Sequence, residues 1–241
     1  MLAALTVEIR KLNRSLALLL AIVAPLLIAI FTFFNVLRLE EAQTWDLWMQ
    51  NGNAIWAFFM LPMSVTALTA LVAQMEHAPK SWDHLRALPL PRWKIYAAKT
   101  LCVLGIVALM SALVLLTTIG AVYAAVAVQP ALAPTGMLNF GAHALVNAKM
   151  LAAALLLIAL QLWMAMRFAS FVPALALGIG GTFFSVVATS ADAGVFMPWQ
   201  MPVNMLATES WRVETALGLG AVGGAIALMA MIAHLSAREV R

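Results

Sequence analysis

Residues 100–126 read TLCVLGIVALMSALVLLTTIGAVYAAV, a stretch that contains no charged side chain. A helix needs about 20 apolar residues to cross the hydrocarbon core of a bilayer. Further apolar runs that meet or approach this length lie at residues 16–37, 54–75, 146–166, 169–190 and 215–235. The alternating pattern of barrel strands is absent from these runs, and lipid requires backbone hydrogen bonds to close within each segment. The sequence therefore predicts an all-α integral membrane protein with six transmembrane helices.

The composition is typical of a chain that is surrounded by lipid. Of the 241 residues, 64% are hydrophobic and 10% are charged, whereas about 25% of the residues in a soluble domain carry a charge. No stretch has the composition of a soluble domain, so we expect residues 1–241 to form a single transmembrane domain. The net charge of +4 does not indicate nucleic-acid binding, because the basic residues form no sustained patch with interleaved aromatic side chains.

The distribution of lysine and arginine predicts the orientation, because these residues gather on the cytoplasmic side of a membrane. With both termini in the cytoplasm, only Arg38, Lys149 and Arg212 fall in segments expected outside. The inner segments then hold Arg10, Lys11, Arg14, Lys80, Arg86, Arg92, Lys94, Lys99, Arg167, Arg238 and Arg241. An even number of spans with cytoplasmic N and C termini satisfies this rule.

The segment before the first span, residues 1–15, has the pattern of a short interfacial helix. Apolar residues recur at helical spacing, namely Leu5, Ile9, Leu12 and, at the start of the first span, Leu16. The charged residues Glu8, Arg10, Lys11 and Arg14 occupy much of the remaining surface. Such a helix places its apolar side at the acyl boundary and its basic side toward anionic headgroups. The alternative is a polar extension of the first span.

Residues 191–214, ADAGVFMPWQMPVNMLATESWRVE, are too polar and too rich in proline to span, yet too apolar for an ordinary loop. We expect an extracellular re-entrant segment that dips partway into the outer leaflet and returns. Met197, Met201 and Met205 recur at every fourth position, a spacing at which their thioether groups could bind copper(I). Two prolines interrupt the segment, so the helical phase needed for a metal site is not assured and we expect no metal.

Two further patterns concern packing. Gly220 and Gly224 have the small-xxx-small spacing that lets helices approach closely. This spacing fits packing within the chain or a seam between two copies. Cys102 is the single cysteine and lies in an apolar run, where a packed thiol is expected rather than a nucleophile.

Residues 76–99, EHAPKSWDHLRALPLPRWKIYAAK, form the longest polar stretch. Trp82, Leu85 and Leu88 fall at helical spacing, with Asp83, His84 and Arg86 on the other sides of the same short helix. A helix of this kind can insert its apolar side into a groove on another protein. It can also lie on the headgroups as a solvated loop anchored by Trp82 and Trp93. The residues alone favour neither interpretation.

Several kinds of chemistry are disfavoured. The chain has no GxxxxGK[ST] phosphate loop, so it cannot bind and hydrolyse ATP in that manner by itself. It has no HExxH motif and no pair of acids within a span. We therefore expect no catalytic residues, and the chain is not expected to be an enzyme.

The stretch at 76–99 resembles the cytoplasmic loop between the second and third spans of type-two ABC exporter permeases. In that family a Glu is followed by a short helix, by LxALPxxR, and by a Lys that opens the next span. The matching residues here are Glu76, Leu85, Ala87, Leu88, Pro89, Arg92 and Lys99. The opening EIRKLNRS, the six spans and the length are similar to the family as well, and RALPLPRWK resembles the branch that includes lantibiotic-immunity permeases. His77 and Pro79 depart from the family's basic run.

The resemblance implies that a cytoplasmic ABC ATPase dimer, which binds ATP and Mg, drives this chain, and that the chain itself holds no cofactor. Residues 78–88 would be the coupling helix between the second and third spans. The implied contacts to the ATPase are Glu76, Ser81, Trp82, Asp83, Leu85, Arg86 and Leu88, and the implied gate residues are Met197, Trp199 and Met201.

A second copy or a sister permease would complete the transporter among the lipids of the bacterial cytoplasmic (inner) membrane. The cargo expected is amphipathic or lipid-like, such as a membrane-active peptide, so that export would confer antimicrobial peptide resistance. The alternative function is a non-transporting membrane sensor or assembly scaffold that recruits a soluble partner through the same loop.

Overall fold

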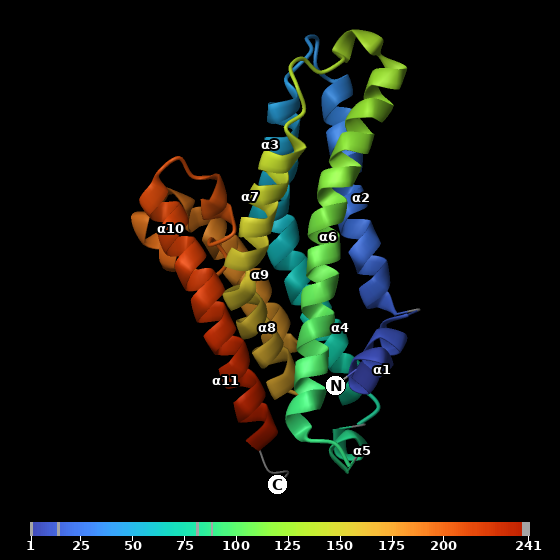
Figure 1. Cartoon of the computed structure of the whole chain (residues 1–241), viewed down its shortest axis with the longest axis vertical. Coiled ribbons are helices and arrows are strands. Elements are labelled where there is room, and N and C mark those ends of the chain that lie inside the picture. Colours follow the sequence, from blue (N-terminus) through green and yellow to red (C-terminus); the bar gives the residue numbers. More distant parts are fainter. Residues whose placement is uncertain (1, 14, 81, 88, 238–241) are drawn as a thin grey trace.

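The computed structural model describes residues 2–13, 15–80, 82–87 and 89–237, except for the side chains of Leu2, Asp83, His84, Arg86 and Ser190. Its regular elements are helices arranged along one long axis (Figure 1), and Thr44 and Thr135 form an isolated bridge between two of the loops. An all-helical membrane protein is therefore confirmed for the described residues.

Four helical segments are long and apolar enough to cross a membrane. They are α2 (Leu16–Leu37), the continuous run of α3 (Trp45–Ile55), η1 (Trp56–Met60) and α4 (Leu61–His77), the helix α6 (Arg92–Val128), and the run of α10 (Ser210–Gly218), η6 (Leu219–Gly223) and α11 (Gly224–Ala237). They correspond to four of the six expected runs, and three of them are longer than expected.

The two other expected runs look different in the structure. The run expected at 146–166 is a pair of helices, α7 (Phe140–Ala153) and α8 (Leu155–Arg167), bent by 40° at their junction. The run expected at 169–190 is α9 (Val172–Val187), which has 16 residues. The described structure thus contains four candidate spans, or five if the bent pair is one span. The exact six-span topology stays a prediction.

The expected interfacial helix is α1 (Leu2–Leu12), which lies beside α6 near the end of the molecule that carries the short helix α5 (Trp82–Ala87). The loop expected at 76–99 is shorter than predicted, because α4 continues through His77 and α6 begins at Arg92. Lys80, with φ of 54°, lies in the turn between α4 and α5. Pro79 lies in the same turn, so the described helix in the region expected to be the coupling helix, residues 78–88, begins at Trp82.

Between α9 and α10 the chain forms the short 3-10 turns η3 (Ala188–Ser190), η4 (Asp192–Phe196) and η5 (Val203–Leu206). This part includes most of the expected re-entrant segment, but residues 210–214 belong to α10. Another 3-10 turn, η2 (Pro130–Leu132), follows α6.

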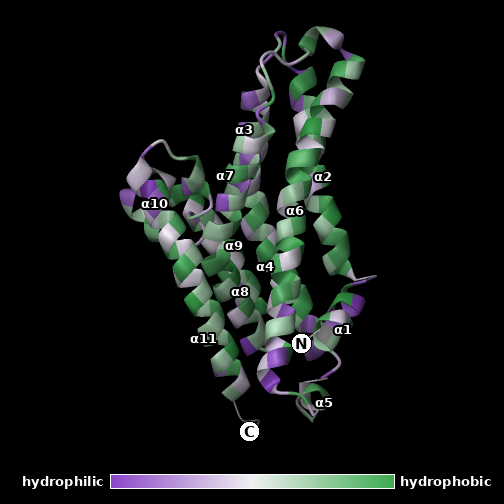
Figure 2. Ribbon diagram, in the orientation of Figure 1, coloured by the Kyte–Doolittle hydropathy of each residue, from purple (hydrophilic) through white to green (hydrophobic). Residues whose placement is uncertain are grey.

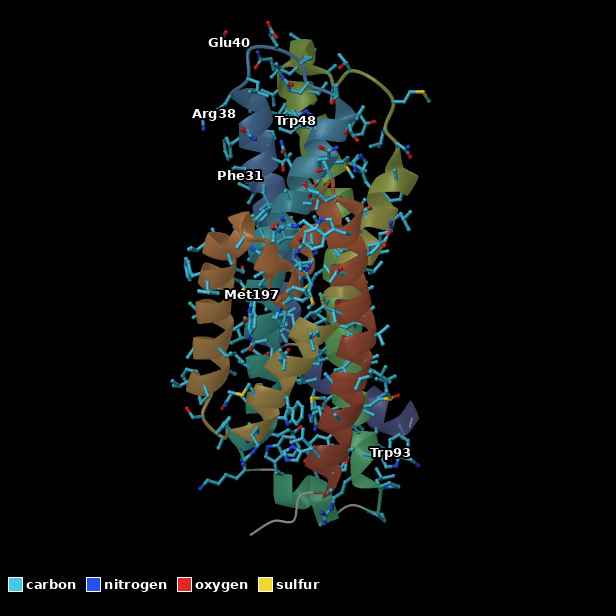
Figure 3. All side chains as sticks on the ribbon, turned by 90° about the vertical axis from the view of Figure 1, so that its left-hand side faces the viewer. Phe31, Arg38, Glu40, Trp48, Trp93 and Met197 are labelled. Atoms are coloured by element: carbon cyan, nitrogen blue, oxygen red, sulfur yellow. The ribbon has the colours of Figure 1, made fainter. Side chains whose placement is uncertain are left out.

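Hydropathy varies along the long axis of the molecule. Figure 2 shows hydrophobic residues along α2, α6 and α11 and hydrophilic residues at the ends of the helices. Arg38 and Glu40 lie at one end and Trp93 lies near the other, while Phe31 projects from the side of α2 (Figure 3). Phe31 is exposed, as expected for an apolar side chain that contacts lipid.

The glycine pair in the last span packs against helices of the same chain. A Cβ added to Gly220 would lie 2.3 Å from the Ala153 carbonyl oxygen, and one added to Gly224 would lie 2.4 Å from the Leu156 backbone nitrogen. Only glycine permits this close approach to the junction of α7 and α8. The structure thus assigns this spacing to packing within the chain.

Gly224→Ala is expected to destabilise the protein by about 1–3 kcal/mol, because the new methyl group overpacks a tight helix contact. The measurement is thermal unfolding of the detergent-solubilised chain. Gly223→Ala is the matched control, since no atom lies within 4 Å of a Cβ at this position. If both variants unfold at the temperature of the unchanged protein, the contact is looser than described.

Candidate functional site

Four charged side chains form a cluster at the end of the helix bundle that carries α5. The ammonium group of Lys99 donates to Glu8 Oε2 at 2.6 Å and to Glu76 Oε1 at 2.8 Å. The ammonium group of Lys11 donates to Glu76 Oε1 at 2.6 Å and to Glu8 Oε1 at 3.2 Å. We call these four residues the charge cluster. It joins three helices, because its members come from α1, α4 and α6.

Local helix geometry brings each residue into place. Glu8 and Lys11 are three positions apart on α1, so they share one face of that helix. Glu76 lies in the last turn of α4, and Lys99 lies about two turns into α6. The charge cluster therefore closes the base of the segment that contains α5.

The charge cluster is largely out of contact with solvent. The exposed fraction is 6% for Glu8, 2% for Glu76 and 0% for Lys99. Charges buried to this degree are stable only when they are paired and hydrogen-bonded, because leaving water is costly for each ion. Two carboxylates face two ammonium groups, and each ammonium bonds both carboxylates. Among the side chains that the structure describes, the charges of the charge cluster thus balance.

Lys11 is the most exposed member of the charge cluster and remains a cation. Burial alone would lower its pKa, but the hydrogen bond to Glu76 and the negative charges of Glu8 and Glu76 outweigh this effect and raise the pKa above its usual value of 10.5. A raised pKa means that folding favours the protonated amine. The Lys11 contribution is therefore complete at neutral pH and is lost only when the solution becomes alkaline enough to deprotonate the folded chain.

Trp82 connects α5 to the charge cluster. Its ring stacks on Tyr96 with centroids 5.7 Å apart, and the Lys99 ammonium lies 5.8 Å from the Trp82 ring centroid. Its indole N–H donates to His77 Nδ1 at 2.9 Å, and His77 Nε2 lies 3.2 Å from the Ala165 carbonyl oxygen. A neutral His77 ring with its hydrogen on Nε2 satisfies both contacts. Trp82 and His77 thereby connect α5 with α6 and with the end of α8.

Leu85 also packs against helices of its own chain. It is half-buried and lines a small apolar cavity of about 130 Å³ with Ala3 and Val7 of α1 and with Leu90 and Ile95. Trp82 and Leu85 therefore share one face of α5, as their spacing predicted, and in the isolated chain that face packs on α1 and α6. Whether they also anchor a partner is not tested by these contacts and stays a prediction.

The other residues expected to contact an ATPase are placed only in part. Glu76 belongs to the charge cluster. Asp83 and Arg86 lie in α5, but their side chains are outside the described residues, as are Ser81 and Leu88 altogether. Sequence reasoning missed Glu8 and Lys11 as partners of Glu76. The signal available for them was an acid and a base three positions apart on a helix expected to lie at the interface.

The expected gate residues lie between α9 and α10, roughly midway along the long axis, where Figure 3 labels Met197. Trp199 and Met201 are buried and Met197 is half-buried. The Trp199 ring packs on α9 so closely that a Cβ on Gly181 would lie 2.3 Å from it. Met201 packs in an apolar cluster with Met205 and Val195. Met201 and Met205 are core side chains in the structure, and the gate role of Met197, Trp199 and Met201 stays a prediction.

A polar cavity of about 540 Å³ lies beside this segment, between α3, α7 and η5. On its wall His143 Nε2 lies 3.1 Å from Asp46 Oδ1. The buried Asn147 side chain donates to Asn53 Oδ1 at 3.1 Å. These contacts couple α3 to α7 beside this segment, at a distance from the charge cluster.

Lys99→Met is expected to destabilise the chain by about 3–5 kcal/mol, because it leaves buried carboxylates with too few cations. Thermal unfolding of the purified protein measures the loss. Adding Glu8→Gln rebalances the charge and should recover part of the stability.

Lys94→Met is the control for this experiment, since Lys94 lies near the same end of α6 with its ammonium 5.8 Å from the Trp93 ring centroid. Equal losses for Lys99→Met and Lys94→Met would show that the charge cluster has no special structural weight.

A family model described as ABC-2 family transporter protein matches residues 4–207, from α1 through η5. No curated protein and no solved structure matched the chain. The family match confirms the resemblance to type-two ABC permeases, although not to the lantibiotic-immunity branch. Members of this permease family lack an ATPase domain. The chain belongs to the ABC-2 family and is the multi-pass membrane permease component of an ABC-2 type transporter.

Proposed function

We propose that this permease has six spans with both termini in the cytoplasm and exports an amphipathic or lipid-like substrate, driven by a separate ATPase dimer that binds α5. A membrane-active peptide is the cargo that membership of the lantibiotic-immunity branch would imply. Two permease chains, identical or related, complete the transporter in the cytoplasmic membrane of a bacterium. In this scheme the chain catalyses no bond chemistry, and its function is conformational.

The observation that carries the proposal is the attachment of α5. This helix has only six residues, too few to be a stable helix in water by itself. It is nevertheless held through Trp82 and Leu85 against α1 and α6, directly beside the charge cluster. A short helix held so firmly at the end of a bundle can transmit a push from a partner, whereas a loose loop would absorb it.

The contacts around α5 define what would move together. The charge cluster joins α1, α4 and α6, and the path from Trp82 through His77 reaches Ala165 at the end of α8. Gln74 of α4 also donates to the Ala169 carbonyl oxygen at 3.0 Å. Separating a buried ion pair is costly, so a displacement of α5 moves the ends of these helices as one body. Rigid-body movement of this kind is how ATP-driven closure of the ATPases would reach the spans.

The outer end would respond through the segment between α9 and α10. Arg212 at the start of α10 donates to Asn204 Oδ1 at 3.1 Å and lies 3.6 Å from Asp192. The segment is therefore pinned to the last span, next to the polar cavity. In the proposal, Met197, Trp199 and Met201 form the gate because they lie in this segment.

Trp82→Ala combined with Leu85→Ala is expected to abolish transport and to strip the ATPase from the permease, because α5 loses both of its attachments. The chain is purified from its native membrane, and co-purifying proteins are identified by mass spectrometry, with a GxxxxGK[ST]-containing ATPase expected beside the unchanged chain. Trp93→Ala is the control, since Trp93 is exposed at the start of α6. Stoichiometric ATPase beside the double variant would refute the coupling role. Absence of any ATPase beside the unchanged chain would favour the sensor or scaffold.

The six-span topology predicts the side from which introduced cysteines react. In a Cys102→Ser background, Ser170→Cys should react with a membrane-impermeant maleimide only from the cytoplasmic side, and Ala193→Cys only from outside. Both positions are exposed loops at opposite ends of α9. Reaction of both cysteines from the same side would show that α9 does not cross the membrane.

A further inference from the structure

A groove lies on the surface of the helix bundle along α6, next to the charge cluster. It has a volume of about 610 Å³ and is formed by α1, the start of α2 and α6. Leu5 and Ile9 of α1 form one wall, and Leu101, Gly105 and Leu109 of α6 form the floor. Arg10 is the charged residue of the lining. Among the residues that the structure describes, the groove is thus a largely apolar channel with Arg10 as the cation at its edge.

The floor of the groove is long and narrow, as a site for an extended acyl chain would be. Leu101, Gly105 and Leu109 are four positions apart, so they form one stripe along α6 that runs for about 12 Å. Gly105 leaves a notch in this stripe, because a Cβ at this position would meet no atom within 4 Å. Leu101 and Leu109 are both exposed, and in a spanning helix such residues face hydrocarbon. The stripe therefore suits one acyl chain.

The edge of the groove suits an anion. Arg10 is exposed at the end of α1, and within the described residues no acidic side chain is paired with it. With α1 at the inner interface, its guanidinium lies at the depth of the headgroups, where arginine binds phosphate through paired N–H groups. The occupant that fits both parts is a lipid with a negatively charged head.

The groove and the charge cluster share two helices. On α1, Leu5 and Ile9 face the groove while Glu8 and Lys11 face the charge cluster. On α6, Cys102 lines the groove one turn beyond Lys99. Any ligand that presses α1 against α6 therefore also holds Glu8 and Lys11 at Glu76 and Lys99.

We propose that this groove binds one acyl chain of an anionic glycerophospholipid of the inner leaflet, with its phosphate at Arg10, and that the bound lipid holds α1 in the position that closes the charge cluster. The proposal rests on the orientation given under the proposed function. It adds a lipid ligand to the permease, and with it a dependence of the coupling region on the composition of the membrane.

The first test measures binding to the purified chain without any ATPase, so its outcome is independent of the coupling experiment. Native mass spectrometry counts the lipid retained by the chain when phosphatidylglycerol or phosphatidylcholine with the same acyl chains is added. We expect phosphatidylglycerol to be preferred about fivefold, the effect of one basic side chain at an anionic surface. Arg10→Gln should remove this preference, whereas Arg38→Gln, a change at the opposite end, should not.

The acyl part of the groove is tested by Gly105→Leu, which fills the notch and should abolish retention of phosphatidylglycerol. Gly120→Leu is the matched control, because Gly120 is also an exposed glycine of α6 with open space around it and lies outside the groove. Equal retention of the two lipids would overturn the anionic headgroup, and unchanged retention in Gly105→Leu would overturn the groove as the site.

Cys102, the only cysteine of the chain, reports on occupancy. Phosphatidylglycerol should slow its reaction with a membrane-soluble maleimide and should slow hydrogen exchange of the α1 amides in the same titration. If Cys102 reacts slowly whether or not lipid is added, and reacts faster when the protein is diluted, a second copy of the chain covers the groove and the lipid proposal is overturned. Protection of Cys102 without slower exchange in α1 would overturn the link to the charge cluster.

Discussion

Two carboxylates and two ammonium groups meet at one end of this molecule, where little water reaches them. Glu76 and Lys99 are both buried, and the cost of removing such ions from water must be offset by close partners of opposite charge. Their pairing fixes the distance between the end of α4 and the start of α6, and Glu8 and Lys11 bring α1 to the same point. The position of α5 then follows, since the chain has few residues in which to connect α4 with α6.

Next to this end, the two sides of α6 differ in their contacts. Trp82 contributes its aromatic face to Tyr96 and its N–H to His77, so that the short helix is attached by both apolar and polar contacts. On the other side of α6, Leu101 and Leu109 in the groove are exposed within the described part of the chain. The same helix therefore has one face that is complete within the chain and one face that fits lipid. A permease that must move in response to a partner benefits from a rigid end next to an adaptable one.

The sequence predicted the helical membrane fold well and the relations between helices less well. The run at 16–37 matches α2 at both ends because its flanking residues are polar. The bend at Ala154 could not be predicted, since the run around it is uniformly apolar. It lies where the glycine face of the last span contacts α7 and α8, which is a tertiary contact. Spacing likewise placed Trp82 and Leu85 on one face of α5 but could not tell whether that face meets the permease or a partner. The sequence singled out Glu76 as a contact to an ATPase, and that role stays a prediction. Its described cationic partners Lys11 and Lys99 come from α1 and α6, and no helical periodicity links these helices to α4.

The unequal lengths of the helices have a consequence for the surrounding membrane. The helix α6 has 37 residues, about 55 Å at 1.5 Å per residue, whereas the 16 residues of α9 extend only about 24 Å. The hydrocarbon core of a bilayer is about 30 Å thick. In the six-span arrangement the bilayer must thin beside α9 and can keep its full thickness beside α2 and α6, because exposed backbone at the ends of a short span is costly in hydrocarbon. In that arrangement the lipid layer around the chain would be thinner on one side, and lipids with short acyl chains would gather beside α9.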